Sequence, residues 1–379
     1  MKRRHFLALA GGGVILAAGG FALTRTPHAA LAPWAEAGAP RYDDPRLNAL
    51  SHAILAPNPH NRQPWLVELE GSDGVTLRFD TSRQLPHTDP FDRQLTIGLG
   101  CFLELMRMAA AANGYRAEME TFPEGHSEEG LDTRPVARAR FTADSALEPD
   151  LLWPHVPARR SNKEPFDTTR PVPQPALDRI LAEATEATPM GGTVAPQEVQ
   201  AWRALTEDAL RIEIETPRTY QESVDLFRIG KREINANPDG IDFSGPLFEA
   251  LHLTGQFTRE TALDTSSAAY IQGIDAVLEN CRTATGHVWM VTPTNTRDDQ
   301  LAAGATWLRA NLAATREGLS FQPLSQALQE YPEMAAHYRT VHERLAPDGG
   351  TVQMLSRLGY GPEVQVSPRW PLEAKLVTA

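Results

Sequence analysis

The segment Ala56–Trp65 (Ala-Pro-Asn-Pro-His-Asn-Arg-Gln-Pro-Trp) concentrates groups that could bind a ligand. Its three prolines exclude helix and restrict the backbone. Asn58, His60, Asn61 and Gln63 offer both hydrogen-bond donors and acceptors. A stiff loop of this kind, ending on a large aromatic residue, suits a flat heteroaromatic ligand with a polar edge. An ordinary proline- and asparagine-rich turn explains the same pattern.

A second candidate is the run Arg159–Lys163 (Arg-Arg-Ser-Asn-Lys), which places three cations and a hydroxyl within five residues of an acidic chain. Arginine binds phosphate through two hydrogen bonds, lysine binds it as a point charge, and serine binds it through its hydroxyl. Arg93 and Arg369 are lone cations beside proline-containing turns. The competing interpretation is a solvated surface patch for the run and surface salt bridges for the two lone arginines.

The sequence contains no recognisable pattern for metal binding or nucleophilic catalysis. The eleven histidines lack the His-Glu-x-x-His spacing, neither a Gly-x-Ser-x-Gly segment nor a P-loop occurs, and Gly98-x-Gly100 lacks the third glycine of a dinucleotide-binding turn. Cys101 and Cys281 are too few for a disulfide framework, and two buried free thiols fit better than one disulfide. We therefore assign no catalytic pair and no metal site.

The composition indicates a folded, acidic protein. The chain has 379 residues, of which 41% are hydrophobic, and its net charge is −12. Residues 1–32 carry four positive charges and no acid, so their removal changes the net charge to −16. Such a body is a poor partner for nucleic acid or an anionic membrane surface.

The N-terminus resembles a bacterial twin-arginine export signal. Lys2–Leu7 contains an arginine pair, a Gly/Ala-rich apolar run extends to about Leu23, and Ala30-Leu31-Ala32 offers a cleavage site. A short membrane helix is the alternative, and an uncleaved signal would act as an anchor. We expect the twin-arginine export machinery as a partner and a periplasmic location. Because this pathway carries folded proteins, often with an inserted cofactor, it favours a bound cofactor without naming one.

Hydrophobic periodicity and breakers predict helices mixed with strands. The expected helices span 44–55, 94–113, 174–185, 198–214, 219–235, 268–284 and 298–318, and the strands span 65–69, 75–79, 115–122, 136–141, 287–292 and 352–360. Helices and strands do not alternate regularly, which favours an α+β fold over a doubly wound sheet. Residues 237–264 lack clear periodicity, and a loop-rich insertion of this length is typical of a lid or arm.

Together, these segments resemble the nitroreductase family of flavoproteins and, within it, the Acg-like branch. The matching segments cover most of residues 45–375 and follow one another as 56–65, 88–93, 159–166, 301–325, 357–361 and 368–372. One departure is Trp370, where this branch usually has a second arginine.

The branch resembles two nitroreductase units fused in one chain. The resemblance therefore implies a nitroreductase-like α+β fold with two units, each a β-sheet flanked by helices. The expected boundaries are a signal at 1–32, a linker at 33–43 and units at 44–157 and 158–379, with the lid at about 237–264.

The resemblance also implies FMN, bound without a covalent bond. Arg369 would meet the FMN phosphate, and the Arg-Arg-Ser segment would hold phosphate and ribityl groups. The residues that this implies for FMN binding are Asn61, Gln63, Pro64, Trp65, Leu66, Val67, Arg93, Arg160, Ser161, Lys163, Ser325 and Arg369.

The implied activity is that of an FMN-dependent oxidoreductase, with hydride transfer through the flavin N5 between a small-molecule electron donor, such as NAD(P)H, and an acceptor. The alternative is a protein that stores or sequesters FMN with little or no NAD(P)H turnover. That alternative follows from the lid and weak nicotinamide reactivity of the Acg-like branch. The chain would act as a monomer that mimics the family's dimer, or as a homodimer.

Overall fold

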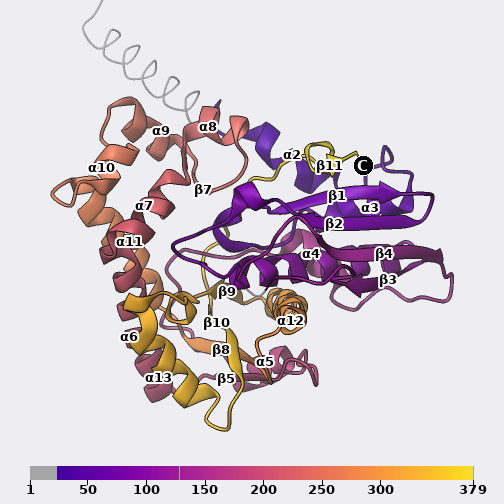
Figure 1. Ribbon diagram of the computed structural model, residues 1–379. Helices are drawn as coiled ribbons and strands as arrows, with labels where there is room; N and C mark the ends of the chain where they lie inside the picture. The colour runs from indigo at the N-terminus through magenta and orange to yellow at the C-terminus, as the bar shows by residue number, and fades with distance from the viewer. Residues whose placement is uncertain (1–23, 128, 379) are drawn as a thin grey trace, which may run out of the picture.

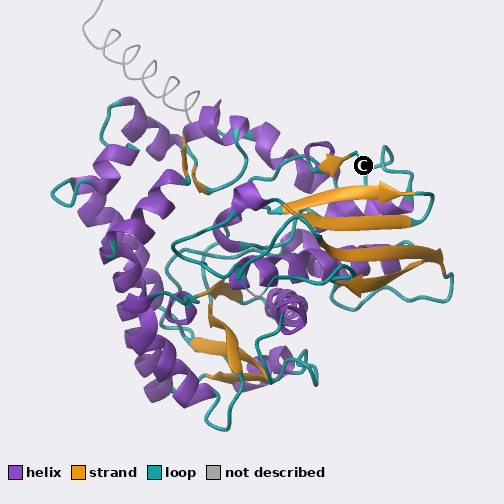
Figure 2. Cartoon of the chain, in the orientation of Figure 1, coloured by secondary structure: helices purple, strands orange, loops and turns teal. Residues whose placement is uncertain are grey.

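The computed structural model describes residues 24–127 and 129–378. The twin-arginine pair and the apolar run up to residue 23, both predicted to belong to an export signal, lie outside the described residues. Two separate β-sheets with flanking helices make up the body (Figures 1 and 2). The predicted α+β class is therefore confirmed.

The first sheet has the strand order β11-β1-β2-β4-β3. Its strands are β1 (Trp65–Glu70), β2 (Gly74–Phe79), β3 (Tyr115–Thr121), β4 (Pro135–Ala143) and β11 (Leu376–Val377). The expected hairpin is confirmed, because β1 and β2 pair antiparallel with Trp65 opposite Phe79. β11 runs parallel to β1, with Val67 opposite Leu376, so the end of the chain returns to the first sheet. This return brings the C-terminal segment beside the loop that precedes β1.

The second sheet has the order β5-β8-β10-β9, and all of its pairings are antiparallel. Its strands are β5 (Met190–Thr193), β8 (Gly286–Thr292), β9 (Ser320–Pro323) and β10 (Thr351–Gly359). The helices of this half are α5 (Gln174–Leu181), α6 (Pro196–Glu215), α11 (Ala268–Arg282), α12 (Arg297–Arg316) and α13 (Ala335–Leu345). Short 3-10 helices are η1 (Pro59–Asn61), η2 (Thr81–Arg83), η3 (Trp153–Ala158), η4 (Gln326–Leu328), η5 (Pro332–Met334) and η6 (Leu372–Ala374).

Two twenty-residue helices, α4 (Arg93–Ala112) and α12, join the halves between the sheets (Figure 1). A side chain at Gly100 would collide with the backbone of Leu301, and one at Gly304 would collide with the backbone of Ile97. Both glycines therefore permit a close helix contact. Among the described residues, only α4 is long and apolar enough to cross a membrane, and 83% of its apolar window is buried inside the protein. α3 (Pro45–Ala53) also packs on α4.

The predicted lid forms part of a third layer with its own small core. This layer contains α7 (Pro217–Asp225), β6 (Phe227–Ile229), α8 (Gly230–Ala236), β7 (Ile241–Phe243), α9 (Pro246–Leu253) and α10 (Arg259–Leu263). β6 interrupts the helix predicted over 219–235, because it pairs in parallel with β7. Phe227 packs edge-on against Phe243, and both contact Phe257. The burial of these aromatic rings stabilises an ordered structure in residues 237–264, which the lack of periodicity in the sequence did not indicate.

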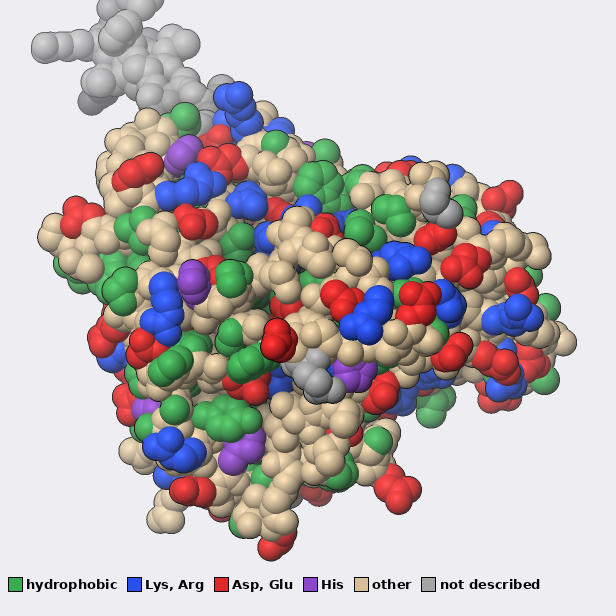
Figure 3. All heavy atoms as spheres, viewed as in Figure 1, with side chains coloured by type: hydrophobic (Ala, Val, Ile, Leu, Met, Phe, Trp, Pro, Cys, Tyr) green, Lys and Arg blue, Asp and Glu red, His purple; other side chains and the backbone are tan. Residues whose placement is uncertain are grey.

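The prediction of a linker at 33–43 needs correction, because residues 33–36 belong to α2 (His28–Glu36). This helix packs on the body, and its Ala30 and Pro33 are buried. Pro33 lies inside the helix, which explains why the sequence favoured an irregular segment. On the face shown in Figure 3, acidic and basic side chains are intermingled.

Candidate functional site

The loop before β1 has an unusual backbone. His60, Asn61 and Gln63 have φ values of 47°, 51° and 51°, in the left-handed region that side chains other than glycine rarely adopt. The Asn58 Oδ1 atom accepts a hydrogen bond of 2.7 Å from the Gln63 amide and closes the turn. Backbone strain of this kind is concentrated at functional sites in proteins.

Gln63 ties three segments together. Its side chain is buried, its Nε2 donates to the Pro238 carbonyl at 2.6 Å, and its Oε1 accepts from the Trp370 amide at 2.9 Å. The Gln63 carbonyl accepts from the Lys375 Nζ at 2.7 Å. Burial is the main reason that the pKa of Lys375 falls to about 8. Gln63 therefore connects the loop to the lid and to the C-terminal segment, and both ends of its amide are occupied.

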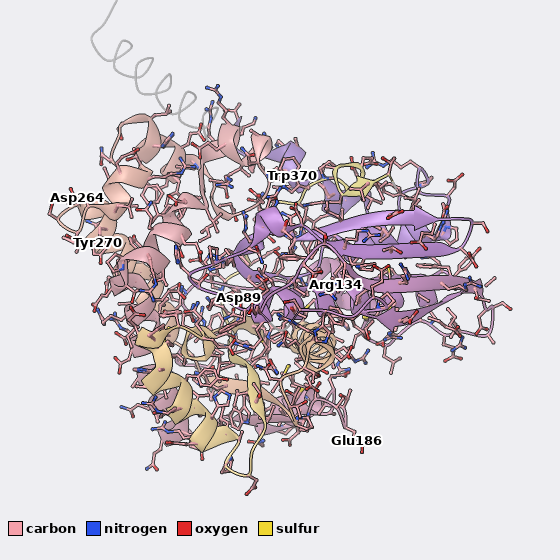
Figure 4. All side chains as sticks on the ribbon, in the orientation of Figure 1. Asp89, Arg134, Glu186, Asp264, Tyr270 and Trp370 are labelled. Atoms are coloured by element: carbon pink, nitrogen blue, oxygen red, sulfur yellow. The ribbon has the colours of Figure 1, made fainter. Side chains whose placement is uncertain are left out.

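Arg369 reaches the same loop from the C-terminal segment. Its Nη1 donates to the Asn61 Oδ1 at 2.7 Å, and its Nη2 donates to the carbonyls of Leu55 and Ala56 at 3.1 Å each. Its Nε atom is buried and has no hydrogen-bond partner. Trp370, labelled in Figure 4, lies beside α2 and β11, and its Nε1 is also buried without a partner.

Arg159 is a second buried cation at this place. Its Nη2 also donates to the Leu55 carbonyl, at 3.1 Å, while its Nη1 is buried without a partner. Burial lowers the pKa of Arg159 to about 10, and burial together with the neighbouring Arg159 lowers the pKa of Arg369 to about 9. Within residues 24–127 and 129–378, neither guanidinium forms a salt bridge. Two buried cations, each with an N–H group that has no hydrogen-bond acceptor, form a site that favours an anion.

The indole of Trp34, on α2, covers this pair. The guanidinium carbons of Arg159, Arg160 and Arg369 lie 5.8, 5.4 and 5.6 Å from its ring. Each such cation–π contact contributes about 0.5–2 kcal/mol, depending on its desolvation. Trp34 therefore offsets part of the cost of holding like charges together.

The segment predicted to be a lid, residues 237–264, places an acidic residue at the edge of the site. Burial raises the pKa of Asp242, on β7, against the opposing effects of Lys163 and Arg369. His60 stands near Lys163, and burial followed by the Lys163 charge lowers the pKa of His60 to about 4. His60 is therefore neutral at pH 7, and its buried Nδ1 has no hydrogen-bond partner. These groups place one acid and one neutral imidazole next to the arginines.

A buried carboxylate fixes the start of the lid. Asp239 is 2% exposed and accepts hydrogen bonds from the Nε and Nη2 of Arg228 at 3.1 and 2.9 Å. It also pairs with Arg83 and lies 3.9 Å from the Nη1 of Arg62. The backbone amide of Gly240 donates to the Asn61 carbonyl at 3.3 Å. The segment predicted to be a lid is thus docked on the loop before β1.

The structure brings together several of the residues predicted from the sequence. Asn61, Gln63 and Arg369 are connected by the contacts above, and Arg160 joins them through Trp34. Ser161 is half-buried, and Lys163 is exposed.

The predicted residues of β1 lie in the core. Trp65 and Val67 are fully buried, and the Trp65 ring packs at 5.0 Å from the Phe102 ring of α4. Pro64 is buried and Leu66 is half-buried. Trp65 therefore anchors the C-terminal end of the loop to the core through its packing on α4.

Arg93 and Ser325 need a different description from the predicted one. The Arg93 guanidinium binds Glu330 at 3.0 Å and the carbonyls of Leu328 and Gln353 at 2.6 and 2.8 Å, so protein groups engage each of its nitrogens. Ser325 donates to the Leu355 carbonyl at 3.4 Å, at the start of η4. Neither residue contacts Arg369. Arg93 instead borders a separate polar cavity of about 120 Å³, lined by Phe91, Arg93, Asn295, Arg297, Gln300 and Glu330.

Arg159 and Trp34 are the residues that the prediction of the site omitted. Arg159 begins the same basic run, but a sequence does not show which arginine of a pair is buried. Trp34 lies in the segment predicted to be a linker. Trp34 and Tyr42 are the aromatic residues of that segment, and their presence was the available signal.

Comparisons with known proteins add a relationship in sequence. No family model matches the chain. An uncharacterized protein of Mycobacterium tuberculosis, Rv3127, is 30% identical over 151 residues, which cover 36% of this chain and 41% of the relative. The chain thus spans about two fifths of the length of the first relatives it matches. The Acg protein of the same organism, named provisionally as an NAD(P)H nitroreductase, is 32% identical over 120 residues, covering 31% of this chain and 35% of that protein.

A third relative, Rv3131 of the same organism, also carries a provisional NAD(P)H nitroreductase name. It is 25% identical over 332 residues, which cover 83% of this chain and 84% of the relative. The chain is similar to nitroreductases in sequence.

Solved structures include similar chains. The FMN-dependent nitroreductase NfnB of Mycobacterium smegmatis, in complex with NADPH, aligns with a TM-score of 0.34 and 16% identity, covering 57% of this chain and 92% of that one. A nitroreductase from Anabaena variabilis, itself named provisionally, aligns with a TM-score of 0.39 and 10% identity, covering 76% and 69%. Both TM-scores are below 0.5, so the fold described above rests on the elements of this chain.

Proposed function

We propose that this protein is an FMN-binding oxidoreductase of nitroreductase type. The observation that carries the proposal is the buried pair Arg159 and Arg369, which has unpaired N–H groups and no acidic partner within hydrogen-bond distance among the described residues. FMN ends in a phosphate that such a pair would neutralise. The FMN-dependent nitroreductases among the similar solved structures support the choice of this cofactor.

The residues fit the group on structural grounds. The Nη1 of Arg159 and the Nε of Arg369 would donate to phosphate oxygens, with Ser161 and Lys163 at the edge of the site. His60 and Asn61 lie on the left-handed loop beside these cations, where a flat ring system and its polar edge would bind. FMN supplies hydride transfer through its N5 when bound. The chain itself would anchor the phosphate, orient the ring through the loop and limit access through the lid.

The two-unit organisation belongs to this proposal. Each half has its own sheet, and α4 and α12 pack together along glycines. The loop and Arg369 would come from opposite ends of the chain, as in a site shared between two units. We propose that the fused chain works as a monomer that mimics a dimer, with unit boundaries near 44–157 and 158–379. We also propose export by the twin-arginine pathway to the periplasm, based on the arginine pair and apolar residues of 2–7, with the signal retained as an anchor.

The second candidate function is storage of FMN. It is favoured by the number of bonds that close the lid, because Gln63 holds Pro238 and Asp239 holds Arg228. A closed lid slows the entry of a nicotinamide. NAD(P)H is also scarce outside the cytoplasm, so an exported protein would need another electron donor.

Mixing the purified full chain with excess NADPH in the absence of air separates these functions. Loss of the flavin absorbance within seconds supports an efficient NADPH-dependent reductase. Persistent yellow colour that dithionite bleaches supports storage or a different donor. Purified protein that binds no flavin, even after incubation with FMN, overturns both.

A further inference from the structure

Helix α2 is connected to the arginine site on one side and to α8, just before the predicted lid, on the other. The Ala30 carbonyl accepts from the Arg369 amide at 2.8 Å, and the Ala30 amide donates to the Asn235 Oδ1, on α8, at 3.1 Å. The Trp34 Nε1 donates to the Ser367 carbonyl at 2.9 Å. α2 thus lies between the C-terminal segment and α8, as Figure 1 also shows.

The residues just before α2 extend the contact to the lid. The Lys231 Nζ donates to the Thr24 carbonyl at 3.0 Å, and Arg25 pairs with Glu249, on α9, at 3.2 Å. α2 is therefore held at both ends, and its indole is fixed in orientation by its own hydrogen bond.

That fixed indole determines how the cations are presented. Three guanidiniums share one aromatic ring at 5.4–5.8 Å. The negative face of the ring attracts each cation and separates charges that would otherwise repel one another. The Nη1 of Arg159 and the Nε of Arg369 remain without a partner in this arrangement.

We infer that Trp34 is a positioning residue of the anion site: it holds the guanidiniums of Arg159 and Arg369 in place for a phosphate and, with α2, limits the rate at which a phosphorylated ligand leaves. This inference deepens the proposed FMN site and rests on it. It also gives residues 24–36 a role in the folded protein, because cleavage after Ala32 would remove the Ala30 bonds to Arg369 and Asn235.

The test compares Trp34→Leu and Trp34→Phe with the wild type, all as full chains. One readout is the dissociation constant of inorganic phosphate for flavin-free protein, and the other is the rate of FMN loss on dilution. We expect Trp34→Leu to weaken phosphate binding about tenfold and to speed FMN loss by about the same factor. Trp34→Phe keeps an aromatic face and should stay within about threefold of the wild type. The matched control is Trp289→Leu, a half-buried tryptophan of β8 that packs on Trp202.

The outcomes separate this inference from the proposed function. Phosphate and FMN constants of Trp34→Leu equal to those of the wild type overturn the role of Trp34 while FMN binding stands. Phosphate binding by the wild type without FMN binding overturns the proposed cofactor instead. Should Trp34→Leu fail to fold, Asn235→Ala removes only the bond to Ala30 and is expected to speed FMN loss by about threefold. An unchanged rate in Asn235→Ala would then count against the inference.

Discussion

The Nη1 of Arg369 donates to the Oδ1 of Asn61 at 2.7 Å, across 308 positions of the chain. This bond joins the end of the C-terminal segment to the loop before β1. It exists because β11 pairs with β1 and pulls the last residues back onto the first sheet. The proposed function depends on this closure, since it places the cation of one segment beside the strained backbone of another.

Replacement of Arg369 by glutamine should weaken FMN retention. The variant loses one charge-assisted contact to the phosphate, worth about 1.5–3 kcal/mol, or roughly a tenfold to hundredfold change in the dissociation constant. The measurement is FMN occupancy after dialysis, followed by titration. Arg134→Gln is the control, since Arg134 (Figure 4) pairs with nearby Asp132 and donates to the Glu124 carbonyl, and no contact with the arginine site is found among the described residues. Equal retention by Arg369→Gln and the wild type would remove Arg369 from the site.

Asp239→Asn should release the start of the lid. Removal of the buried charge leaves Arg83 and Arg228 without their shared acid, at a cost of about 3 kcal/mol. We expect faster proteolysis within residues 244–264 and faster exchange of bound FMN. Asp264→Asn is the control, because Asp264 is exposed and, among the described residues, its carboxylate accepts hydrogen bonds from Ser266 alone. If Asp239→Asn keeps wild-type proteolysis rates, the lid is held by its aromatic core rather than by this carboxylate.

Gly304→Ala should destabilise the protein by about 3 kcal/mol, because the new methyl group meets the backbone of α4 at Ile97. Chemical denaturation measures the effect. Gly273→Ala is the matched control within a helix, since a methyl group there meets no atom within 4 Å. That substitution should stabilise the chain by about 0.5–1 kcal/mol. Similar effects of the two substitutions would contradict the close α4–α12 contact.

Acid should destabilise the protein partly through His287. Burial lowers the pKa of His287 to about 3, and neither ring nitrogen has a hydrogen-bond partner. Below pH 6.5 His287 binds a proton in the unfolded chain but stays neutral in the folded chain, so the free energy of unfolding falls as the pH decreases. Between pH 8 and pH 4.5 this single group accounts for about 3 kcal/mol.

In the variant His287→Leu, the free energy of unfolding should fall by about 3 kcal/mol less than in the wild type when the pH is lowered from 8 to 4.5. His87→Leu, at an exposed position, should keep the wild-type decline. Identical pH dependence in His287→Leu and the wild type would show that His287 is protonated in the folded state.

Much of the fold could be predicted from local patterns. The hairpin of β1 and β2, and helices α4 and α12, have clear periodicity and end signals: Gly114, with φ of 74°, follows α4, and Thr296 caps α12. β11 and α2 could not be predicted in this way. β11 has two residues and gains its order from pairing with β1, and α2 contains Pro33 and is stabilised by Trp34 and Ala30.

The candidate site was predictable in type more than in detail. The sequence predicted the loop, Arg160 and Arg369 as parts of one site, and the structure places them close together. It did not distinguish Arg159 from Arg160, since their burial depends on α2. The motif around Arg93 predicted an FMN contact. In the structure its guanidinium binds Glu330 and two backbone carbonyls, which lie 235 to 260 positions away in the sequence and so could not be predicted from the local pattern.

Analysis of the small molecule released from purified protein tests the central claim most directly, when wild type is compared with the double variant Arg159→Gln/Arg369→Gln. The proposed site predicts FMN in the wild type, at about one molecule per chain, and loss of FMN from a folded double variant. A wild type that binds no FMN, or a double variant that retains it fully, would contradict the assignment of this buried arginine pair as the phosphate site.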